Sequence, residues 1–402
     1  MTALRLVLTL PIFRLLAAVI GLVGCVNASI MPYQSLIGIE RIGLSHAAFA
    51  AVMVLASAVA VTTSVYVGIL SDQRANRRQI ALVTASFGLA GAALMLMQPN
   101  ALTFVIANGV LLPVGTSVFG QTFALNRLAS GPHPQHREGI QATIRAAMSV
   151  MFLAMLVFWT FAFAAGVDVM AVYLSGALAS LTLVALILGF WPRDGQTTWA
   201  DRPSGLKLSR ALAQLARPMV SLRLLCLGAV ASSGILYMVL VSLIFEQAAG
   251  RGPSDVALYV GLVAGCEVPF MLLMPRYLAH IPRARLILIG TALYICHLVF
   301  MPVLAPTPAI WGMTLVAGLG GTAMLVLPIS YYQDLLATQP GTAAALIALQ
   351  KLVGDVFAAI AFTIGTALGG YALVALIGGG VALTGAVALW WLDARRPFAQ
   401  PT

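Results

Sequence analysis

The chain has 402 residues, of which 61% are apolar and 8% are charged, and its mean hydropathy is +0.99. An ordinary soluble domain carries about 25% charged residues, so this composition excludes a soluble globular protein and indicates a chain surrounded by lipid. The formal net charge of +10 would suggest a nucleic-acid partner in a soluble protein, but here we expect none.

Hydrophobic runs of about 20 residues, long enough to cross about 30 Å of hydrocarbon, alternate with charged or Pro/Gly-rich breaks. The sequence therefore predicts an all-α membrane protein with twelve transmembrane helices. In chain order the predicted spans are residues 12–37, 47–70, 80–97, 101–125, 139–165, 168–190, 218–245, 255–275, 286–304, 308–332, 342–366 and 370–392. Arg5 precedes and Arg14 lies at the start of a full-length first span without a cleavage pattern, so we expect this helix to stay in the mature protein.

The longest polar stretch, from Trp191 to about Arg217, has six predicted spans on each side. We expect an N-terminal six-helix bundle of residues 1–190, a cytoplasmic linker of residues 191–217, and a C-terminal six-helix bundle of residues 218–402. Paired bundles of this kind are related by an axis along the membrane normal.

The basic residues between the spans gather in every second loop and at the chain ends. Only Arg41 and Arg251 fall in the alternate loops. This positive-inside bias predicts a multi-pass protein of the cell inner membrane with both termini and the linker in the cytoplasm. The lipid bilayer is thus one expected partner, and the charge adds only a weak attraction to anionic lipid.

The segment between the second and third spans reads Gly68-Ile-Leu-Ser-Asp72-Gln-Arg74-Ala-Asn-Arg77-Arg78. It resembles the loop motif of the major facilitator superfamily, in which a glycine, an aspartate and a basic pair have this spacing. We interpret it as a gating hinge: Gly68 lets helices approach, Asp72 binds a helix N-terminus or an arginine, and Arg77 and Arg78 hold the loop at the headgroups, with Arg74 beside them. The alternative is an ordinary basic loop.

Further short matches make the chain similar to the sugar efflux transporter family over nearly its whole length. This resemblance implies the major facilitator fold and proton-driven export of a sugar or sugar-like solute by alternating access. The fifth span departs from many exporters, because it reads Leu153-Ala-Met-Leu-Val-Phe-Trp159 in place of a Gly-Pro pair. The matching segments are Gly24, Pro32 to Leu36, Ser71-Asp72 with Arg77-Arg78, Phe123-Ala-Leu125 with Arg145, Glu267-Val-Pro269 and Tyr332-Gln-Asp334.

Two other functions are compatible with the sequence. Met151, Phe158 and Trp159 would suit an apolar ligand, which favours export of an amphipathic drug or another metabolite. A membrane sensor that transports nothing is the other alternative, since a fold does not fix a function.

Among the charged residues of the predicted spans, we place four inside the hydrocarbon, where each is costly and needs a reason. Glu267 lies near the middle of the eighth span, two residues before Pro269, which would bend the helix and free backbone groups. A desolvated carboxyl there could take and release protons near neutral pH; the alternative is a carboxyl that ties two helices together. Lys351 and Asp355, four residues apart, can pair on one helix face, and Asp355 is the second candidate for proton coupling. Arg145 is the fourth charge.

A sugar site needs hydrogen-bonding groups and aromatic faces at mid-membrane depth. By the resemblance, the first, fourth, seventh and tenth helices line the cavity, although each polar residue alone is more typical of a helix-to-helix hydrogen bond than of a ligand contact. The candidates for substrate binding are Asn27, Gln34, Asn108, Gln121, Ser233, Tyr237, Tyr331 and Tyr332, to which we add Arg145 and Lys351. Gly318, Gly320 and Gly321 supply a bendable segment in the tenth span.

The remaining signals argue against catalysis. Each of the four cysteines is alone in an apolar span, and His133 with His136 does not make a metal site. The sequence contains no phosphate-binding Gly-Lys-Ser/Thr loop and no nucleophile elbow. We therefore expect a monomer that is not an enzyme, has no cofactor, and has protons and a small solute as its partners.

Overall fold

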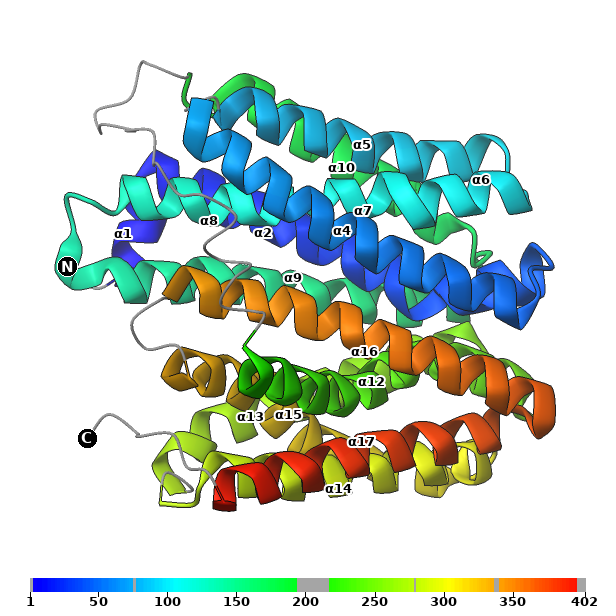
Figure 1. The fold of residues 1–402 in the computed structure, drawn as a ribbon. Helices are drawn as coiled ribbons and strands as arrows, with labels where there is room; N and C mark the ends of the chain where they lie inside the picture. Colours follow the sequence, from blue (N-terminus) through cyan, green and yellow to red (C-terminus); the bar gives the residue numbers. More distant parts are fainter. Residues whose placement is uncertain (1–2, 75–76, 194–216, 278–279, 336–339, 396–402) are drawn as a thin grey trace. The chain divides into compact units, whose positions relative to one another are not determined.

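The computed structural model describes residues 3–74, 77–193, 217–277, 280–335 and 340–395 (Figure 1). It has twelve helical spans that are long and apolar enough to cross a membrane, one for each predicted span, which confirms the helical class and the count. The spans are Pro11–Arg41, His46–Gly68, Arg77–Met97, Ala101–Ala129, Pro134–Ala164, Ala171–Phe190, Pro218–Gln247, Pro253–Met271, Arg283–Leu304, Pro308–Tyr332, Leu346–Leu368 and Gly370–Arg395.

The first and fourth spans change their helical type in their interior. The first consists of α2 (Pro11–Ile30), a 3₁₀ turn, α3 (Gln34–Leu36) and a π-helical turn at Ile37–Arg41. The fourth begins at α6 (Ala101–Ile106), where Asn100 and Thr103 form a capping box, and continues through a π-helical turn, α7 (Leu112–Gly115) and α8 (Val118–Ala129). Pro32 and Pro113 lie in these irregular stretches, since proline has no N–H for the regular helical ladder.

The other labelled helices are mostly continuous (Figure 1). A short α1 (Ala3–Thr9) precedes the first span. The remaining helices are α4 (His46–Arg74), α5 (Arg77–Met97), α9 (Arg137–Ala164), α10 (Ala171–Phe190), α12 (Pro218–Gln247), α13 (Pro253–Tyr277), α14 (Arg283–Leu304), the 3₁₀ turn η5 (Pro308–Gly312), α15 (Met313–Leu335), α16 (Pro340–Leu368) and α17 (Gly370–Arg395).

Contacts divide the chain into two compact units. The first consists of residues 1–33 and 58–206, and the second of residues 34–57 and 207–402. Residues 34–57, placed in the N-terminal bundle by the sequence analysis, thus group with the second unit, where the Ser35 hydroxyl donates to the carbonyl of Val239 at 2.6 Å. Most of the expected linker lies outside the described residues, and the division at residues 191–217 stays a prediction.

In the first unit, α2 packs against α9 and α10, and α10 packs against α5. Gly24 permits the first of these contacts, because a Cβ at that position would lie 2.5 Å from the carbonyl oxygen of Met148. The Trp159 indole donates to the Ser29 hydroxyl at 3.0 Å and stacks on Phe163, so the Trp159 ring is an internal packing residue that joins α9 to α2. The expectation that Trp159 suits an apolar ligand is not supported by this position.

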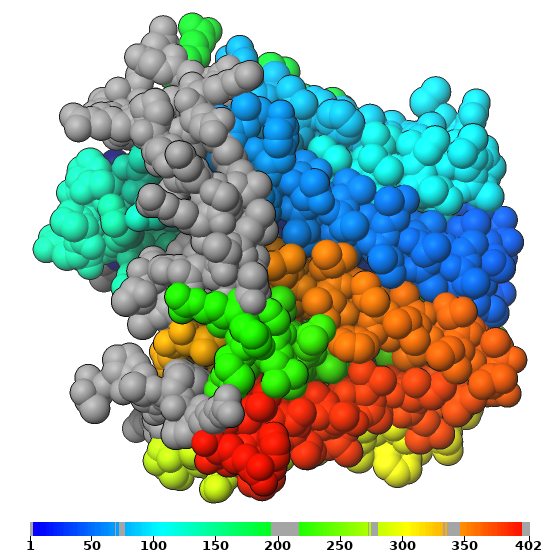
Figure 2. Space-filling model, viewed as in Figure 1, coloured from blue at the N-terminus to red at the C-terminus, as the bar shows by residue number. Residues whose placement is uncertain are grey.

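In the second unit, α12 packs against α16 and α17, and α14 packs against α15 and α17. The α17 helix shows the pattern of a helix in lipid: small residues face its neighbours, and large apolar residues face outward. A Cβ on Gly385 would lie 2.6 Å from the carbonyl oxygen of Cys226 in α12. In the space-filling view α17 (red) is at the surface (Figure 2), and its exposed side chains include Leu376, Leu383, Val387, Trp390 and Trp391.

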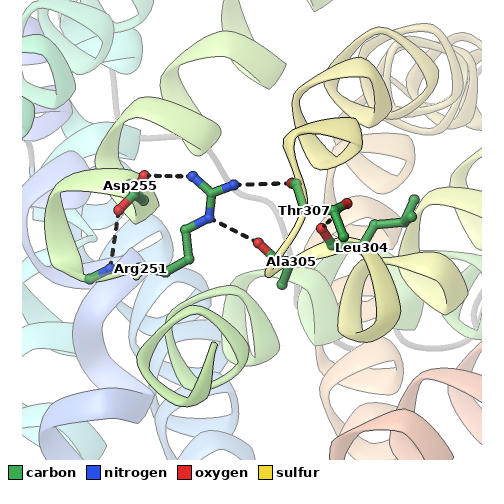
Figure 3. Close-up of polar contacts among 6 residues, drawn as sticks. Arg251, Asp255, Leu304, Ala305 and Thr307 are labelled. Atoms are coloured by element: carbon green, nitrogen blue, oxygen red, sulfur yellow. Dashed lines mark hydrogen bonds and ion pairs between the residues drawn. The ribbon is translucent and has the colours of Figure 1, made fainter. Parts of the chain in front are cut away.

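Arg251, one of the two arginines outside the positive-inside pattern, has a structural role (Figure 3). Its guanidinium donates to the carbonyls of Ala305 at 2.9 Å and Thr307 at 3.0 Å and pairs with Asp255 at 3.1 Å. It also lies over the Trp311 ring, 5.1 Å from its centroid. The arginine therefore ties the loop between α12 and α13 to the loop after α14.

Candidate functional site

The charged residue inside the eighth span, Glu267, lies where α13 crosses α15. A Cβ on Gly318 would lie 2.6 Å from the Cβ of Cys266, and a Cβ on Gly321 would lie 2.5 Å from a carboxylate oxygen of Glu267. The Thr322 hydroxyl donates to the backbone carbonyl of Glu267 at 3.1 Å. The glycines of the tenth span therefore act here as points of close helix approach, and the Glu267 carboxylate lies over one of them.

The Glu267 side chain is half-buried, and α13 continues as a helix past Pro269. Within the described ranges, no ion pair or side-chain hydrogen bond reaches the Glu267 carboxylate; the hydrogen bond between Glu267 and α15 is made by the Glu267 backbone oxygen. The Tyr294 ring of α14 also borders Gly321, with one ring carbon 3.3 Å from the position of an added Cβ. The carboxylate thus lies near glycine backbone and an aromatic ring, and no cation is beside it among the described residues.

Beyond Tyr294 lies a group of rings that we call the Tyr-His cluster: Tyr237, Tyr259, Tyr294 and His297. All four side chains are at most 5% exposed. The His297 ring centroid lies 5.1 Å from that of Tyr237, 5.3 Å from that of Tyr294 and 5.9 Å from that of Tyr259. Of these residues only Tyr237 was predicted from the sequence. His297 had a usable signal, since it is an ionisable side chain inside a predicted span.

The second candidate for proton coupling, Asp355, is already paired. Lys351 donates to its carboxylate at 2.6 Å, as the spacing of four predicted. The side chain of Asp355 is 6% exposed and that of Lys351 is 58% exposed. Asp355 therefore has a cation beside it within the second unit, and Glu267 does not have one in the described structure.

Four candidate substrate residues hydrogen-bond within their own units. Asn108 accepts from the Tyr173 hydroxyl at 3.0 Å, and Gln121 accepts from the Ser71 hydroxyl at 2.8 Å. The Ser233 hydroxyl donates to the carbonyl of Val230 at 2.8 Å. The Tyr331 hydroxyl donates to Asp393 at 2.8 Å and accepts from Arg223 at 2.9 Å. All four side chains are buried. Their hydrogen bonds therefore stabilise the packing of the helices or, for Ser233, one turn of α12.

The other candidates differ in exposure. Asn27 and Gln34 are half-buried in the first span, and Arg145 is exposed on α9. Tyr237 and Tyr332 are buried, and their hydroxyls have no hydrogen-bond partner in the described part of the chain. Asp334, near the end of α15, forms an ion pair with Arg283.

The hinge motif is described only in part, because the side chains of Asp72 and Arg74 lie outside what the structure describes. A Cβ on Gly68 would meet no described atom within 4 Å, so the close approach expected there is not found. Arg77 is buried and donates to the Ser71 hydroxyl at 2.9 Å, and Arg78 donates to the Leu188 carbonyl at 2.7 Å. Arg77 is therefore bound inside the first unit, and its expected place at the headgroups stays a prediction.

Solved structures with the same arrangement of helices come from transporters. A crystal structure of a mutant of the nucleoside transporter NupG aligns with a TM-score of 0.80, covering 94% of this chain and 99% of that one at 14% identity. The peptide transporter POT in complex with sulfate aligns with a TM-score of 0.76 over 98% of both chains, at 10% identity. This is the major facilitator fold. The prediction of the fold is thereby confirmed.

The two sequence relatives found are both named as sugar efflux transporters. The chain is 27% identical to a putative sugar efflux transporter of Deinococcus radiodurans, over 94% of this chain and 96% of that protein. It is 24% identical to sugar efflux transporter B of Salmonella typhimurium over 72% of each. No family model matches the chain. The expected resemblance to sugar efflux transporters is confirmed, and these relatives are transporters, not enzymes, which supports a secondary transporter here.

Proposed function

We propose that this chain is a proton-coupled exporter of a sugar or sugar-like solute that works by alternating access, with Glu267 as the residue that carries the coupling proton. The observation that supports this role is the surroundings of Glu267. Its half-buried carboxylate lies against Gly321 and Tyr294 and has no cation beside it among the described residues. An unpaired carboxylate at that depth is costly, so the group should be protonated when sealed from water and ionised when water reaches it.

One proton is sufficient for export of this kind. A charge that enters down a potential of about 100 mV supplies about 2.3 kcal/mol, and every 1.4 kcal/mol corresponds to about a tenfold concentration ratio. A single titrating carboxyl thus supports a gradient of roughly fifty-fold. Asp355 is the second candidate, but the paired Lys351 makes it a poorer proton carrier.

A sugar as the solute is supported by the names of the two curated relatives and by the chemistry of the candidate contacts. Asn27 and Gln34 carry amides, and Tyr237 and Tyr332 carry aromatic rings with hydroxyls. We keep all ten sequence-based candidates as proposed contacts. Asn108, Gln121, Ser233 and Tyr331, which are bonded within their own units, and Tyr237 and Tyr332, which are buried, are the weaker ones. We likewise propose the segment from Gly68 to Arg78 as a hinge.

The decisive variant for coupling is Glu267→Gln, which mimics the protonated state permanently. The assay measures uptake of labelled monosaccharides, disaccharides and alkyl glycosides into everted vesicles, driven by a pH gradient. We expect Glu267→Gln to abolish accumulation of the sugar and to leave exchange of labelled sugar measurable. Glu246→Gln is the matched control, because Glu246 is an exposed carboxylate at the end of α12. Accumulation by Glu267→Gln against a gradient would refute this role.

The same vesicles separate the remaining functions. Transport of amphipathic dyes but of no sugar would favour a drug exporter, and no flux of either kind would favour a sensor. We also propose that the protein is a monomer in the cell inner membrane with both termini in the cytoplasm, as the distribution of basic residues predicts.

A further inference from the structure

The Tyr-His cluster, in the interior of the second unit, contains four buried polar atoms without partners. Both ring nitrogens of His297 and the hydroxyls of Tyr237 and Tyr259 are buried, and none has a hydrogen bond among the described residues. His297 is 0% exposed. A buried polar group that lacks a hydrogen bond destabilises a protein by about 1–3 kcal/mol, so one such group is unusual and several on neighbouring rings need an explanation.

The simplest explanation, that the cluster bonds to itself, does not hold, because none of these four atoms has a hydrogen bond to another ring of the cluster. His297 meets Tyr237 and Tyr294 edge to face, with interplanar angles of 67° and 69°, and stacks on Tyr259 at 21°. A neutral imidazole needs one acceptor and one donor, and each tyrosine hydroxyl can donate once and accept twice. Water is the ligand that fits these needs, since a buried water molecule bonds to two to four polar groups.

The cluster is part of a longer row of groups within the second unit. From His297 the row continues through Tyr294 to Gly321 and the carboxylate of Glu267. In the other direction the Tyr259 ring lies 6.1 Å from Trp311, over which Arg251 lies (Figure 3 shows the bonds of this arginine). By the predicted topology, the end that holds Arg251 faces away from the cytoplasm.

We propose that the Tyr-His cluster is a water-binding site whose water molecules carry protons between the end of the second unit that holds Arg251 and the carboxylate of Glu267. The proton path rests on the proposed role of Glu267; the water site does not. The ionisable groups along the path are Tyr259, His297, Tyr237 and Tyr294, with Glu267 at one end and Arg251 at the other.

The water site is tested directly by brief X-ray radiolysis of the purified protein in nanodiscs, in which hydroxyl radicals made from bound water oxidise nearby side chains. We expect Tyr237 and Tyr259 to be oxidised several-fold faster than Tyr173, an equally buried tyrosine whose hydroxyl is bonded to Asn108. His297→Phe keeps an aromatic ring but removes both nitrogens, and it should lower both rates toward that of Tyr173. Equal rates for all three tyrosines in the unchanged protein would overturn the water site.

The proton path is tested by infrared spectroscopy of the protonated Glu267 carboxyl, identified as the band that Glu267→Gln removes. After transfer to heavy water, deuteration of this band should be about tenfold slower in His297→Phe, because two hydrogen bonds to water are lost. His297→Gln, which can still donate and accept, should be closer to the unchanged protein. Equal rates in His297→Phe and the unchanged protein would refute the path, and a Glu267 band absent at every pH would refute the proposed role of Glu267 while the radiolysis result stands.

Discussion

The ion pair of Lys351 and Asp355 joins an exposed ammonium group to a buried carboxylate. This difference in exposure determines which single substitution destabilises the protein more. Without Lys351, Asp355 is a buried carboxyl without its cation. Without Asp355, the long side chain of Lys351 can extend to water or the headgroups. Breaking a buried pair by removing one partner is strongly destabilising, whereas replacing both with apolar residues is often tolerated.

We therefore expect Lys351→Met to lower the level of protein in the membrane and the midpoint of thermal unfolding more than Asp355→Leu does. The double variant should match Asp355→Leu, since no buried charge then remains. Thermal unfolding in detergent, followed by fluorescence-detected size exclusion, measures both effects. A double variant whose loss equals the sum of the two single losses would show that the side chains act independently.

Arg77 is a second charged side chain whose contacts within the protein lead to a testable prediction. The sequence suggested a headgroup anchor, yet the guanidinium bonds to Ser71, which in turn bonds to Gln121 of α8. We expect Arg77→Ala to destabilise the first unit by about 1–3 kcal/mol, the range for a buried group that loses its partner. Arg127→Ala is a control at an exposed arginine in the last turn of α8. Equal unfolding midpoints for the two variants would contradict the buried role of Arg77.

Glycines, which have no side chain, let neighbouring helices of this protein pack closely. In α17 the glycines at positions 378, 379 and 385 lie against neighbouring helices, while Gly380 faces outward with no atom near. Since lipid chains are as apolar as leucine, close packing takes the place of the hydrophobic effect between such helices. The hydropathy pattern predicts that a helix exists, but it cannot say which of several adjacent glycines lies at a contact.

This difference between glycines gives a matched pair of substitutions. Gly385→Ala places a methyl group 2.6 Å from the Cys226 carbonyl and should force α17 away from α12, lowering thermal stability. Gly380→Ala meets nothing and should be neutral or stabilising by up to about 1 kcal/mol, the difference in helix propensity. Thermal unfolding of both variants in the same detergent decides the matter. Similar losses in both would mean that propensity or lipid contact, not the α12 contact, controls stability here.

At the scale of the whole chain, hydrophobic length predicted all twelve spans, because crossing the hydrocarbon requires a fixed number of apolar residues. Only part of the candidate site could be predicted from the sequence. The Glu267 position and the pairing of Lys351 with Asp355 follow from depth and spacing alone. The Tyr-His cluster does not, since its residues come from three helices and only packing brings them together. The grouping of residues 34–57 with the second unit is likewise a long-range contact that no local pattern encodes.

The orientation of the whole chain stays a prediction from its basic residues, and reporter fusions test it. A fluorescent protein that folds only in the cytoplasm should be bright when fused after residue 402 or inserted in residues 194–216. Inserted next to Gly250, beyond the end of α12, it should be dark. The reverse pattern would show that the positive-inside rule misassigns this protein, and the end that holds Arg251 would then face the cytoplasm.

The bonds of Arg251 also have a consequence for biosynthesis. Its carbonyl partner Ala305 lies 54 residues later in the chain, which a ribosome translating at about 5–20 residues per second adds in roughly 3–10 s. During that interval the arginine can bond to Asp255 but not to the carbonyls of Ala305 and Thr307. The hairpin of α12 and α13 therefore enters the membrane before its loop is bound to the loop after α14. Stalling translation between these two positions should therefore leave the α12–α13 loop open to protease, and release of the stall should close it.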